Sequence, residues 1–161
     1  MTNQPNISIR DYRPSDLRAV VTLFSTSVHG LASAHYDATQ RLVWAPEEAD
    51  LQAWQVRLAA LQIRLAEHRE QLTGFIGFTA NGHIELLFSS PLYARQGVAT
   101  ALYRDAEACL RSLGVASVFT EASLTARPFF TRQGFSVEQA QTVARGAVTL
   151  QRFAMRKPLR P

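Results

Sequence analysis

Residues 88–102 read Phe-Ser-Ser-Pro-Leu-Tyr-Ala-Arg-Gln-Gly-Val-Ala-Thr-Ala-Leu. The apolar run from Ile84 to Ser89 predicts a strand that ends before Pro91, and the small residues after Gly97 predict the first turn of a helix. A strand that leads through a short loop into a helix presents unpaired backbone N–H groups and the positive end of the helix dipole at one point. The pattern therefore predicts an anion site, and phosphate is the most common guest of such sites.

The predicted phosphate loop fits neither of two common nucleotide-binding patterns. A Walker loop requires a Gly-Lys-Ser/Thr ending, and the dinucleotide-binding pattern requires three glycines, whereas this loop has no lysine and only Gly97. Gly97 and Ala99 leave room for a ligand to approach the backbone, and Arg95 adds a guanidinium fork suited to phosphate.

The loop resembles the pyrophosphate-binding signature of the GNAT acyltransferase superfamily, Gln/Arg-x-x-Gly-x-Gly/Ala. Gly97 and Ala99 match its fourth and sixth positions, whereas Ala94 replaces the first. Residues 123–135, Ser-Leu-Thr-Ala-Arg-Pro-Phe-Phe-Thr-Arg-Gln-Gly-Phe, resemble a second family segment, Asn-x-x-Ala-x-x-aromatic-Tyr-x-x-x-Gly-Phe, at the expected distance downstream. Two motifs in the right order are far more specific than one.

The order of the predicted elements also resembles the GNAT fold. Alternation and turn residues predict strands at 7–12, 62–68, 72–80, 84–89, 116–123, 135–143 and 147–155. Helical spacing and caps predict five helices. The first begins after an N-cap at Ser15, the second runs from a capping box at Asp37 and Gln40 to Pro46, and the others lie along Leu51–Leu61, from Gly97 to Gly114 and at 127–133. Asn81-Gly82 predicts a two-residue hairpin turn. The predicted class is α/β in the mixed α+β sense, a twisted mixed sheet of about seven strands with helices on both faces.

Within the superfamily, three segments resemble a bacterial YafP-like branch of acetyltransferases: His35-Tyr36, Trp44-Ala45-Pro46 and residues 126–130. The resemblance covers nearly the whole chain, and a length of 161 residues favours one domain, so we expect residues 1–161 to form a single domain. The sheet edges and the last hairpin make a homodimer an open expectation.

Composition narrows the classes of partner. The chain has 161 residues, of which 47% are hydrophobic and 19% charged, and it has no apolar run of the ~20 residues that span a membrane. The polar start, Met1 to Asn6, lacks the apolar core of a signal peptide. One cysteine, Cys109, excludes an internal disulfide and is expected to be a buried spectator. We therefore expect a cytoplasmic protein with no membrane partner.

Charge is unevenly distributed along the chain. Residues 1–90 carry seven arginines against nine acidic residues, whereas residues 91–161 carry ten basic against four acidic residues. The positive half contains the predicted phosphate loop, which suits a polyanionic small ligand. A nucleic-acid-binding domain is the competing class, but the arginines are scattered and form no basic run, so no nucleic-acid partner is expected.

The resemblance implies that acetyl-CoA is the acyl donor, and the spacing of the histidines supports no metal. The backbone of Leu87, Phe88 and Ser89 would pair with the pantetheine arm. The backbone N–H groups of the loop would hold the pyrophosphate, with Arg104, Arg132 or both near the nucleotide phosphates. The loop residues concerned are Arg95, Gln96, Gly97, Val98, Ala99 and Thr100.

Direct acetyl transfer to an amine requires a base for an ammonium of pKa near 10 and a proton for the departing thiolate. Family members commonly carry the acid as a Tyr where this chain has Phe130, so Ser123, Tyr103 or a water are the open alternatives. Glu85 is the first candidate for the base and Glu121 the second. Alternation predicts that Glu85, Leu87 and Ser89 share one face of their strand and that Ile84, Leu86 and Phe88 share the other.

The acceptor site is expected between the first helices and the last hairpin. Tyr36 and Trp44 are predicted to line a site for an apolar or aromatic amine, with His35, Trp54 and Phe153 nearby. The structural alternative is that these aromatic residues only pack the helices onto the sheet. His83 is expected to be exposed, and no histidine has the spacing of a metal ligand. Since Phe130 has no proton to give, a non-catalytic acyl-CoA-binding module remains the alternative function.

Overall fold

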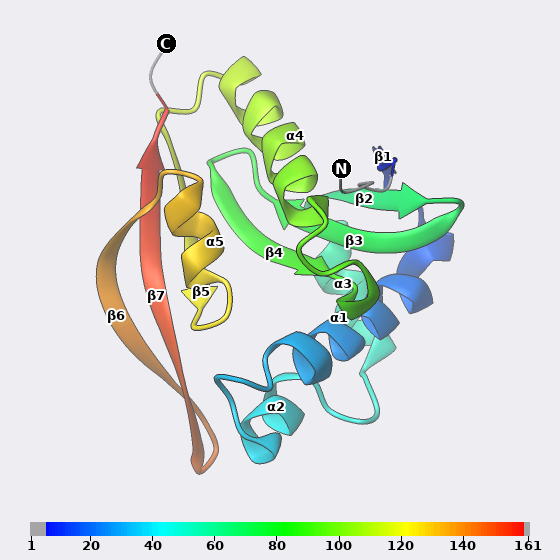
Figure 1. Ribbon diagram of the computed structural model, residues 1–161, viewed down its shortest axis with the longest axis vertical. Helices are drawn as coiled ribbons and strands as arrows, with labels where there is room; N and C mark the ends of the chain where they lie inside the picture. Colours follow the sequence, from blue (N-terminus) through cyan, green and yellow to red (C-terminus); the bar gives the residue numbers. More distant parts are fainter. Residues whose placement is uncertain (1–5, 160–161) are drawn as a thin grey trace.

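Seven strands form one mixed sheet in the order β1-β2-β3-β4-β5-β7-β6 (Figure 1). The computed structural model describes residues 6–159, so the polar start at residues 1–5 and the last two residues lie outside the description. The strands are β1 (Ser8–Asp11), β2 (Gln62–His68), β3 (Gln71–Phe78), β4 (His83–Ser89), β5 (Ser117–Ser123), β6 (Ser136–Arg145) and β7 (Val148–Pro158). The helices are α1 (Leu17–Leu31), α2 (Ala38–Trp44), α3 (Leu51–Ala59), α4 (Val98–Ser112) and α5 (Arg127–Arg132), with 3-10 turns η1 (Pro14–Asp16) and η2 (Pro91–Tyr93).

The predicted element order and fold class are confirmed. Strands β4 and β5 pair in parallel, and every other pair of neighbouring strands is antiparallel. Helix α4 connects the two parallel strands, as a crossover between parallel neighbours requires. The sheet is therefore mixed, and its parallel pair, β4 and β5, lies in its middle.

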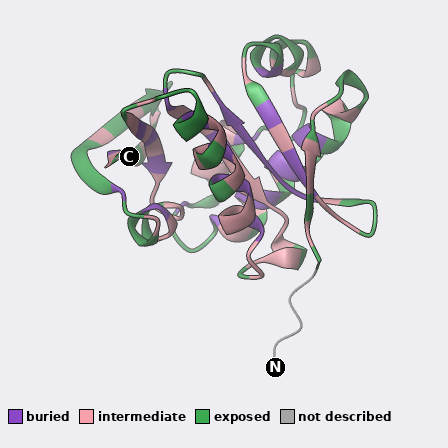
Figure 2. Cartoon of the chain, turned by 90° about the horizontal axis from the view of Figure 1, so that it is seen from above, coloured by how far each residue is buried: buried purple, intermediate pink, exposed green. Residues whose placement is uncertain are grey.

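Two apolar cores hold the helices onto opposite faces of the sheet. On one face Phe24 of α1 and Leu58 of α3 pack with Phe75 and Leu86. On the other face α4 and α5 cover a second core, in which Leu102 is fully buried. Figure 2 shows the buried residues following the sheet and the inner faces of these helices, with exposed residues outside. The candidate site lies in the middle of the sheet, where β4 and β5 separate.

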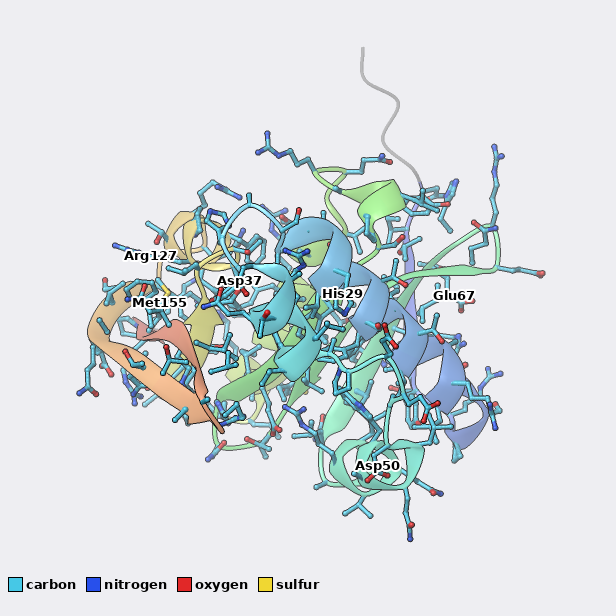
Figure 3. The ribbon with its side chains drawn as sticks, turned by 90° about the horizontal axis from the view of Figure 1, so that it is seen from below. His29, Asp37, Asp50, Glu67, Arg127 and Met155 are labelled. Carbon is cyan, nitrogen blue, oxygen red and sulfur yellow. The ribbon has the colours of Figure 1, made fainter. Side chains whose placement is uncertain are left out.

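Carboxylate caps fix the starts of the short helices. Asp37 accepts from the backbone N–H of Gln40 at 2.7 Å, and the Gln40 side chain accepts from the Asp37 N–H, so the predicted capping box is confirmed. Asp50 caps α3 by accepting from the N–H of Ala53 at 3.0 Å, without a reciprocal bond. Figure 3 labels Asp37 and Asp50. The predicted cap at Ser15 is wrong. The chain makes the turn η1 there, and Asp16 accepts the N–H of Arg13 instead.

The hairpin turns differ from the sequence signal. Asn81-Gly82 lies in a four-residue connection between Phe78 and His83 rather than in a two-residue turn. Only Gly82 has a positive φ, of 103°, whereas the predicted turn type needs positive φ at both central residues. The tight left-handed turn occurs instead between β2 and β3, where Arg69 and Glu70 have φ of 51° and 64°.

Candidate active site

The loop between β4 and α4 contains backbone N–H groups that have no acceptor among residues 6–159. Gly97 precedes α4 with a φ of 85°, and no side chain caps the helix. Arg95 also takes the left-handed conformation, with a φ of 59°. Within the described part of the chain, no acceptor pairs with the N–H groups of Arg95 and of the four residues from Gly97 to Thr100. An arrangement of this kind attracts anions through both its donors and its helix dipole.

Gln96 departs from the predicted donor set. Its backbone N–H donates to the Tyr93 carbonyl at 3.3 Å, and its side chain donates to the Leu92 carbonyl at 3.4 Å. Both groups therefore close the loop on itself. The predicted role of the Gln96 N–H as a phosphate donor is not supported, whereas the N–H groups of Arg95 and Gly97 have no acceptor among residues 6–159.

Strands β4 and β5 separate immediately upstream of this loop. They pair only at His83 with Phe119 and at Ile84 with Thr120. Beyond that point β4 keeps its partners on β3 up to Ser89, but its other edge faces no strand. Leu87, Phe88 and Ser89, the predicted pantetheine contacts, thus lie on a strand edge whose hydrogen-bonding groups are free on one side.

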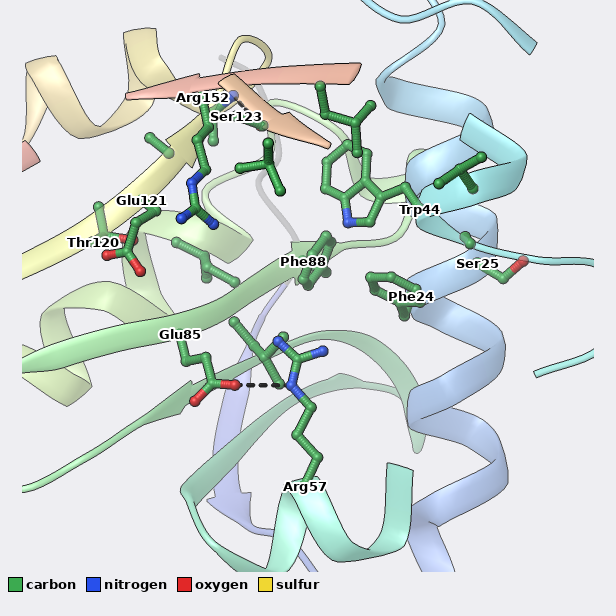
Figure 4. A pocket seen from close by; sticks show the side chains of 18 of the residues that line it. Phe24, Ser25, Trp44, Arg57, Glu85, Phe88, Thr120, Glu121, Ser123 and Arg152 are labelled. Carbon is green, nitrogen blue, oxygen red and sulfur yellow. Dashed lines mark hydrogen bonds and ion pairs between the residues drawn. The ribbon is translucent and has the colours of Figure 1, made fainter. Parts of the chain in front are cut away.

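A cavity of about 790 Å³ fills the opening between the strands and the helices α1 to α3. Ile84 to Phe88 of β4 and Thr120 to Ser123 of β5 form its floor, and Ala126 and Phe130 line it as well. Since Phe130 belongs to the core under α4 and α5, the cavity reaches through the gap from one face of the sheet to the other. Figure 4 shows the side chains that point into it.

Glu85 lies in the cavity, but on a different face from the one predicted. The pairing of β3 with β4 skips Glu85, because Gly77 pairs with Leu86 and Phe78 pairs with Ile84. This bulge breaks the alternation, so Ile84 joins the core under α4 whereas Leu86 joins the core under α1. Glu85 turns toward α3, where its Oε1 accepts from Arg57 Nε at 2.8 Å (Figure 4).

Glu121 is the second carboxylate in the cavity, and it is paired with a histidine. Its two oxygens lie 3.0 and 3.1 Å from His83 Nε2. The His83 ring stacks on Phe119 with centroids 4.9 Å apart and an angle of 7° between the planes. The prediction that His83 is exposed is wrong, because its side chain is only 24% exposed. The position of His83 next to Asn81-Gly82 does not indicate that Glu121 of the neighbouring strand is its partner.

Ser123 lies at the end of β5 with its hydroxyl oxygen occupied. Ser123 Oγ accepts from the N–H of Ala126 at 3.0 Å and so holds the turn that leads into α5. A hydroxyl that accepts one hydrogen bond still has a proton to donate.

The structure adds Arg152 to this group, a residue that the sequence analysis did not single out. Arg152 lies opposite Ser123 in the pairing of β5 with β7, and its guanidinium points into the cavity toward Glu121 (Figure 4). Its Nε donates to Gln141 Oε1 at 2.9 Å. The sequence shows only an arginine within the last predicted strand. Which residues Arg152 faces depends on how β7 pairs with β5 and β6, and local sequence does not determine this register.

Aromatic side chains form the opposite wall. Trp44 has edge-to-face contacts with Phe24, Tyr36 and Phe88, at centroid distances of 6.5, 5.4 and 6.2 Å. The predicted neighbours His35 and Phe153 do not line this cavity. His35 is exposed and contacts Thr125, and Phe153 packs toward the other core.

Tyr36 lines the cavity but is occupied as a structural link. Its hydroxyl donates to the Gln151 carbonyl at 2.7 Å and accepts from the Leu124 N–H at 2.9 Å. Burial raises the pKa of the Tyr36 hydroxyl, which keeps it neutral. Tyr36 therefore joins the segment after α1 to β7 and to the turn after β5, and both the lining and the packing interpretations hold for it.

Phe130, which stands where the family commonly has its acid, and Tyr103, one of the alternatives for the acid, differ in position. Phe130 is 3% exposed, lines the cavity and packs edge-to-face on Tyr103 and Phe135. Tyr103 lies behind it, outside the cavity lining, and its hydroxyl donates to Glu107 at 2.8 Å. Burial raises the pKa of Tyr103 above its ordinary value. The structure thus does not support Tyr103 as the acid.

The remaining predicted residues are peripheral. Arg104 and Arg132 are exposed, and Arg132 lines a separate hollow with His35 and Arg127. Cys109 is half-buried rather than fully buried. Residues 6–159 contain no group of three or more histidine, cysteine or acidic side chains placed to hold a metal. In the same range, no helix combines the length and apolar character that crossing a bilayer would need.

Comparison with known proteins identifies the family. Residues 32–157 match the model of the acetyltransferase (GNAT) domain. The chain belongs to the GNAT acetyltransferase family. It is 38% identical over 143 residues to the uncharacterized N-acetyltransferase YafP of Escherichia coli K12, covering 88% of this chain and 90% of YafP. The predicted superfamily and its YafP-like branch are confirmed, and this GNAT chain is an acyltransferase of the N-acetyltransferase type.

Solved structures show the same fold. A GCN5-related N-acetyltransferase from Rhodopseudomonas palustris superposes with a TM-score of 0.92 at 26% identity, over 99% of this chain and 98% of the other. The PaiA N-acetyltransferase from Thermoplasma acidophilum, solved in complex with coenzyme A, superposes with a TM-score of 0.76 at 20% identity, over 96% and 99% of the two chains.

Proposed function

We propose that this GNAT domain, residues 1–161, transfers the acetyl group of acetyl-CoA to a primary amine of a small molecule or a peptide by direct attack. The observation that carries the proposal is the cluster of unpartnered N–H groups before and within the first turn of α4, next to the free edge of β4. The complex of the PaiA N-acetyltransferase with coenzyme A supports a donor of this class.

The residues present fit such a donor. The N–H groups of Arg95 and of Gly97 to Thr100 would hold the pyrophosphate, and the free edge of β4 at Leu87 to Ser89 would pair with the amides of the pantetheine arm. Arg132 remains a further candidate for the nucleotide phosphates. A homodimer remains a prediction, with β6 as an exposed edge of the sheet.

The chemistry of the cavity fits amine acetylation. Bound acetyl-CoA supplies an acetyl group activated as a thioester. The acceptor enters mostly as an ammonium, and the carboxylate of Glu85 or Glu121 takes its proton so that the nitrogen lone pair can form the new C–N bond as the C–S bond breaks. Ser123 keeps its hydroxyl proton available at the same end of β5. A thiolate of pKa near 8.5 leaves partly unaided, so the phenyl ring of Phe130 does not preclude turnover.

A non-catalytic acyl-CoA-binding module is the second candidate, and one observation favours it. Phe130 places a phenyl ring, which has no hydroxyl proton to donate, in the cavity at the position where the family commonly has a tyrosine. This alternative predicts donor binding without turnover on any amine.

Calorimetric titration with acetyl-CoA, followed by detection of free thiol with a panel of amines, separates the two. Binding with amine-dependent thiol release supports the enzyme. Binding without release on any amine supports the module and makes Phe130→Tyr the next variant. Absence of acetyl-CoA binding contradicts both.

A further inference from the structure

Two arginines that line the cavity, Arg145 and Arg152, form no ion pair with a carboxylate among the described residues, and of the two only Arg152 is partly buried. Arg57 in the same cavity pairs with Glu85, and elsewhere Arg156 pairs with Glu138 and Lys157 with Glu107. Arg152 is only partly exposed, yet among the described residues no carboxylate forms an ion pair with it. Its guanidinium points into the cavity, toward Glu121 (Figure 4). A guanidinium fork of this kind matches the two oxygens of a carboxylate.

We infer that the acceptor is an amine that also carries a carboxylate, namely an α-amino acid with an aromatic or large apolar side chain, and that Arg152 binds its carboxylate. The inference rests on the proposed acetyltransferase function and names the acceptor class of the same site. It uses three parts of the cavity: Arg152, the carboxylate of Glu121 and the aromatic wall around Trp44.

The opposite charges face each other across a gap. Arg152 of β7 lies opposite Ser123 of β5, and Ser123 is two residues after Glu121. The side chains of Arg152 and Glu121 therefore point to the same face of the sheet (Figure 4). They form no ion pair with each other, and the Glu121 carboxylate lies against His83 instead. A zwitterion fits between these groups, with its ammonium near the Glu121 carboxylate and its carboxylate on Arg152, and Glu85 lines the same cavity.

The side chain of the acceptor has an apolar wall to contact. Phe24, Trp44 and Phe88 pack edge-to-face on the side of the cavity toward α1, and Figure 4 shows them facing the charged groups. Aromatic rings in such arrangements attract further rings edge-on or offset. The volume of about 790 Å³ leaves room for a large amino acid beside the acyl end of the donor.

A matched set of acceptors tests this inference at saturating acetyl-CoA. Phenylalanine, phenylalaninamide and 2-phenylethylamine share the ring and the amine, but only phenylalanine has a carboxylate. In the unmodified protein we expect phenylalanine to have a kcat/KM at least about tenfold above those of the other two. In Arg152→Gln that advantage should disappear, mainly because the KM for phenylalanine rises by about 10- to 100-fold. The kcat/KM for 2-phenylethylamine should change by less than about threefold.

Two further variants are controls. Arg152→Lys keeps the charge without the fork and should recover part of the phenylalanine activity. Arg18→Gln removes the same charge from an exposed position of α1 outside the cavity and should leave the preference unchanged. Acetyl-CoA binding by calorimetry should be equal in all variants, which also shows that they are folded.

The failures are distinguishable. If 2-phenylethylamine equals or exceeds phenylalanine in the unmodified protein, the acceptor inference is overturned while the acetyltransferase function stands. Thiol release only with peptides overturns it in the same way. Acetyl-CoA binding without release on any amine overturns the acceptor inference and the catalytic proposal together but leaves the donor site, and no acetyl-CoA binding removes the proposed function itself. If Arg152→Gln fails to fold, the comparison in the unmodified protein decides.

Discussion

Gly97 takes a φ of 85° directly before the first turn of α4, a conformation in which any β-carbon is strained. It also belongs to the cluster of free N–H groups. Substitution Gly97→Glu adds a strain of roughly 1–2 kcal/mol and places a carboxylate where an anion is proposed to bind. We expect acetyl-CoA affinity to fall by at least about 100-fold in a calorimetric titration.

A matched control lies at the other end of the same helix. Gly114 has a φ of 76°, and no atom lies within 4 Å of the position that a β-carbon would take there, so Gly114→Glu carries the same strain and charge without touching the loop. It should bind acetyl-CoA as the unmodified protein does. If Gly97→Glu retains normal affinity, the donor loop has been assigned wrongly.

Glu85 is the first candidate for the base, and its bulge directs it toward Arg57 inside the cavity. Glu85→Gln keeps the size of the side chain but cannot take a proton, so we expect the rate to fall by about 100-fold, most strongly near neutral pH, with acetyl-CoA affinity similar. Thiol release across a pH series measures this. Glu138→Gln, an exposed acidic position on β6, is the control and should retain the rate. An unchanged rate in Glu85→Gln would leave Glu121 as the base.

Single residues show where sequence reasoning reaches and where it stops. Glu85 was predictable because an acid inside an apolar strand is uncommon, Glu121 because alternation puts it on the same face as Ser123, and both line the cavity. The face of Glu85 was not predictable, because a bulge is a property of the pairing with β3 rather than of β4 alone. Arg152 and the His83–Glu121 pair were missed for a similar reason: their partners are separated by about 30 residues of chain or more and meet only through strand register.

At the scale of elements, a small polar network holds α4 against β7. Glu107 of α4 accepts from Lys157 Nζ at 2.5 Å and from the Tyr103 hydroxyl at 2.8 Å. Burial by itself would raise the pKa of Glu107, but the hydrogen bonds from Lys157 and Tyr103 outweigh it and hold that pKa below its ordinary value. Its ionised form is therefore stabilised by folding.

Glu107→Gln is expected to lower the free energy of unfolding by about 1–3 kcal/mol at pH 7, because it leaves a half-buried ammonium unpaired. A depressed folded pKa contributes stability above the unfolded value of about 4.3, and this contribution is lost as the pH falls through the folded pKa. Denaturant titrations at pH 7 and pH 3 should therefore show the gap between the two proteins shrinking at the lower pH. An equal gap at both would contradict the role of the carboxylate charge.

Elements were predicted well where the signal is local. The capping box at Asp37 and the glycines at the two ends of α4 depend on a few adjacent residues, and both are confirmed. The cap at Ser15 failed because Asp16 offers a carboxylate to the N–H of Arg13 and also pairs with Arg10 of β1. The turn at Asn81-Gly82 failed because the Asn81 side chain accepts from the His83 N–H and opens a wider connection.

At the scale of the whole molecule, the separation of two parallel neighbouring strands opens the cavity. Strands β4 and β5 are parallel and pair at only two positions, whereas β5 and β7 pair from Ser117 to Ser123. The sheet therefore opens in its middle, beside the loop with the free N–H groups. The sequence predicted the strands and the loop, but not the extent of the opening, because it depends on how far two neighbouring strands stay in register.

This arrangement predicts which amides acetyl-CoA protects from hydrogen exchange. Residues 85–100 should gain protection, because the free edge of β4 and the N–H groups after Arg95 would acquire acceptors. Strands β1 and β2 at the far edge of the sheet should exchange as before. Gly97→Glu should abolish the gain at the same acetyl-CoA concentration. Protection confined to β6 and β7 would place the donor elsewhere, since only a ligand lying between β4 and β5 satisfies both groups of donors at once.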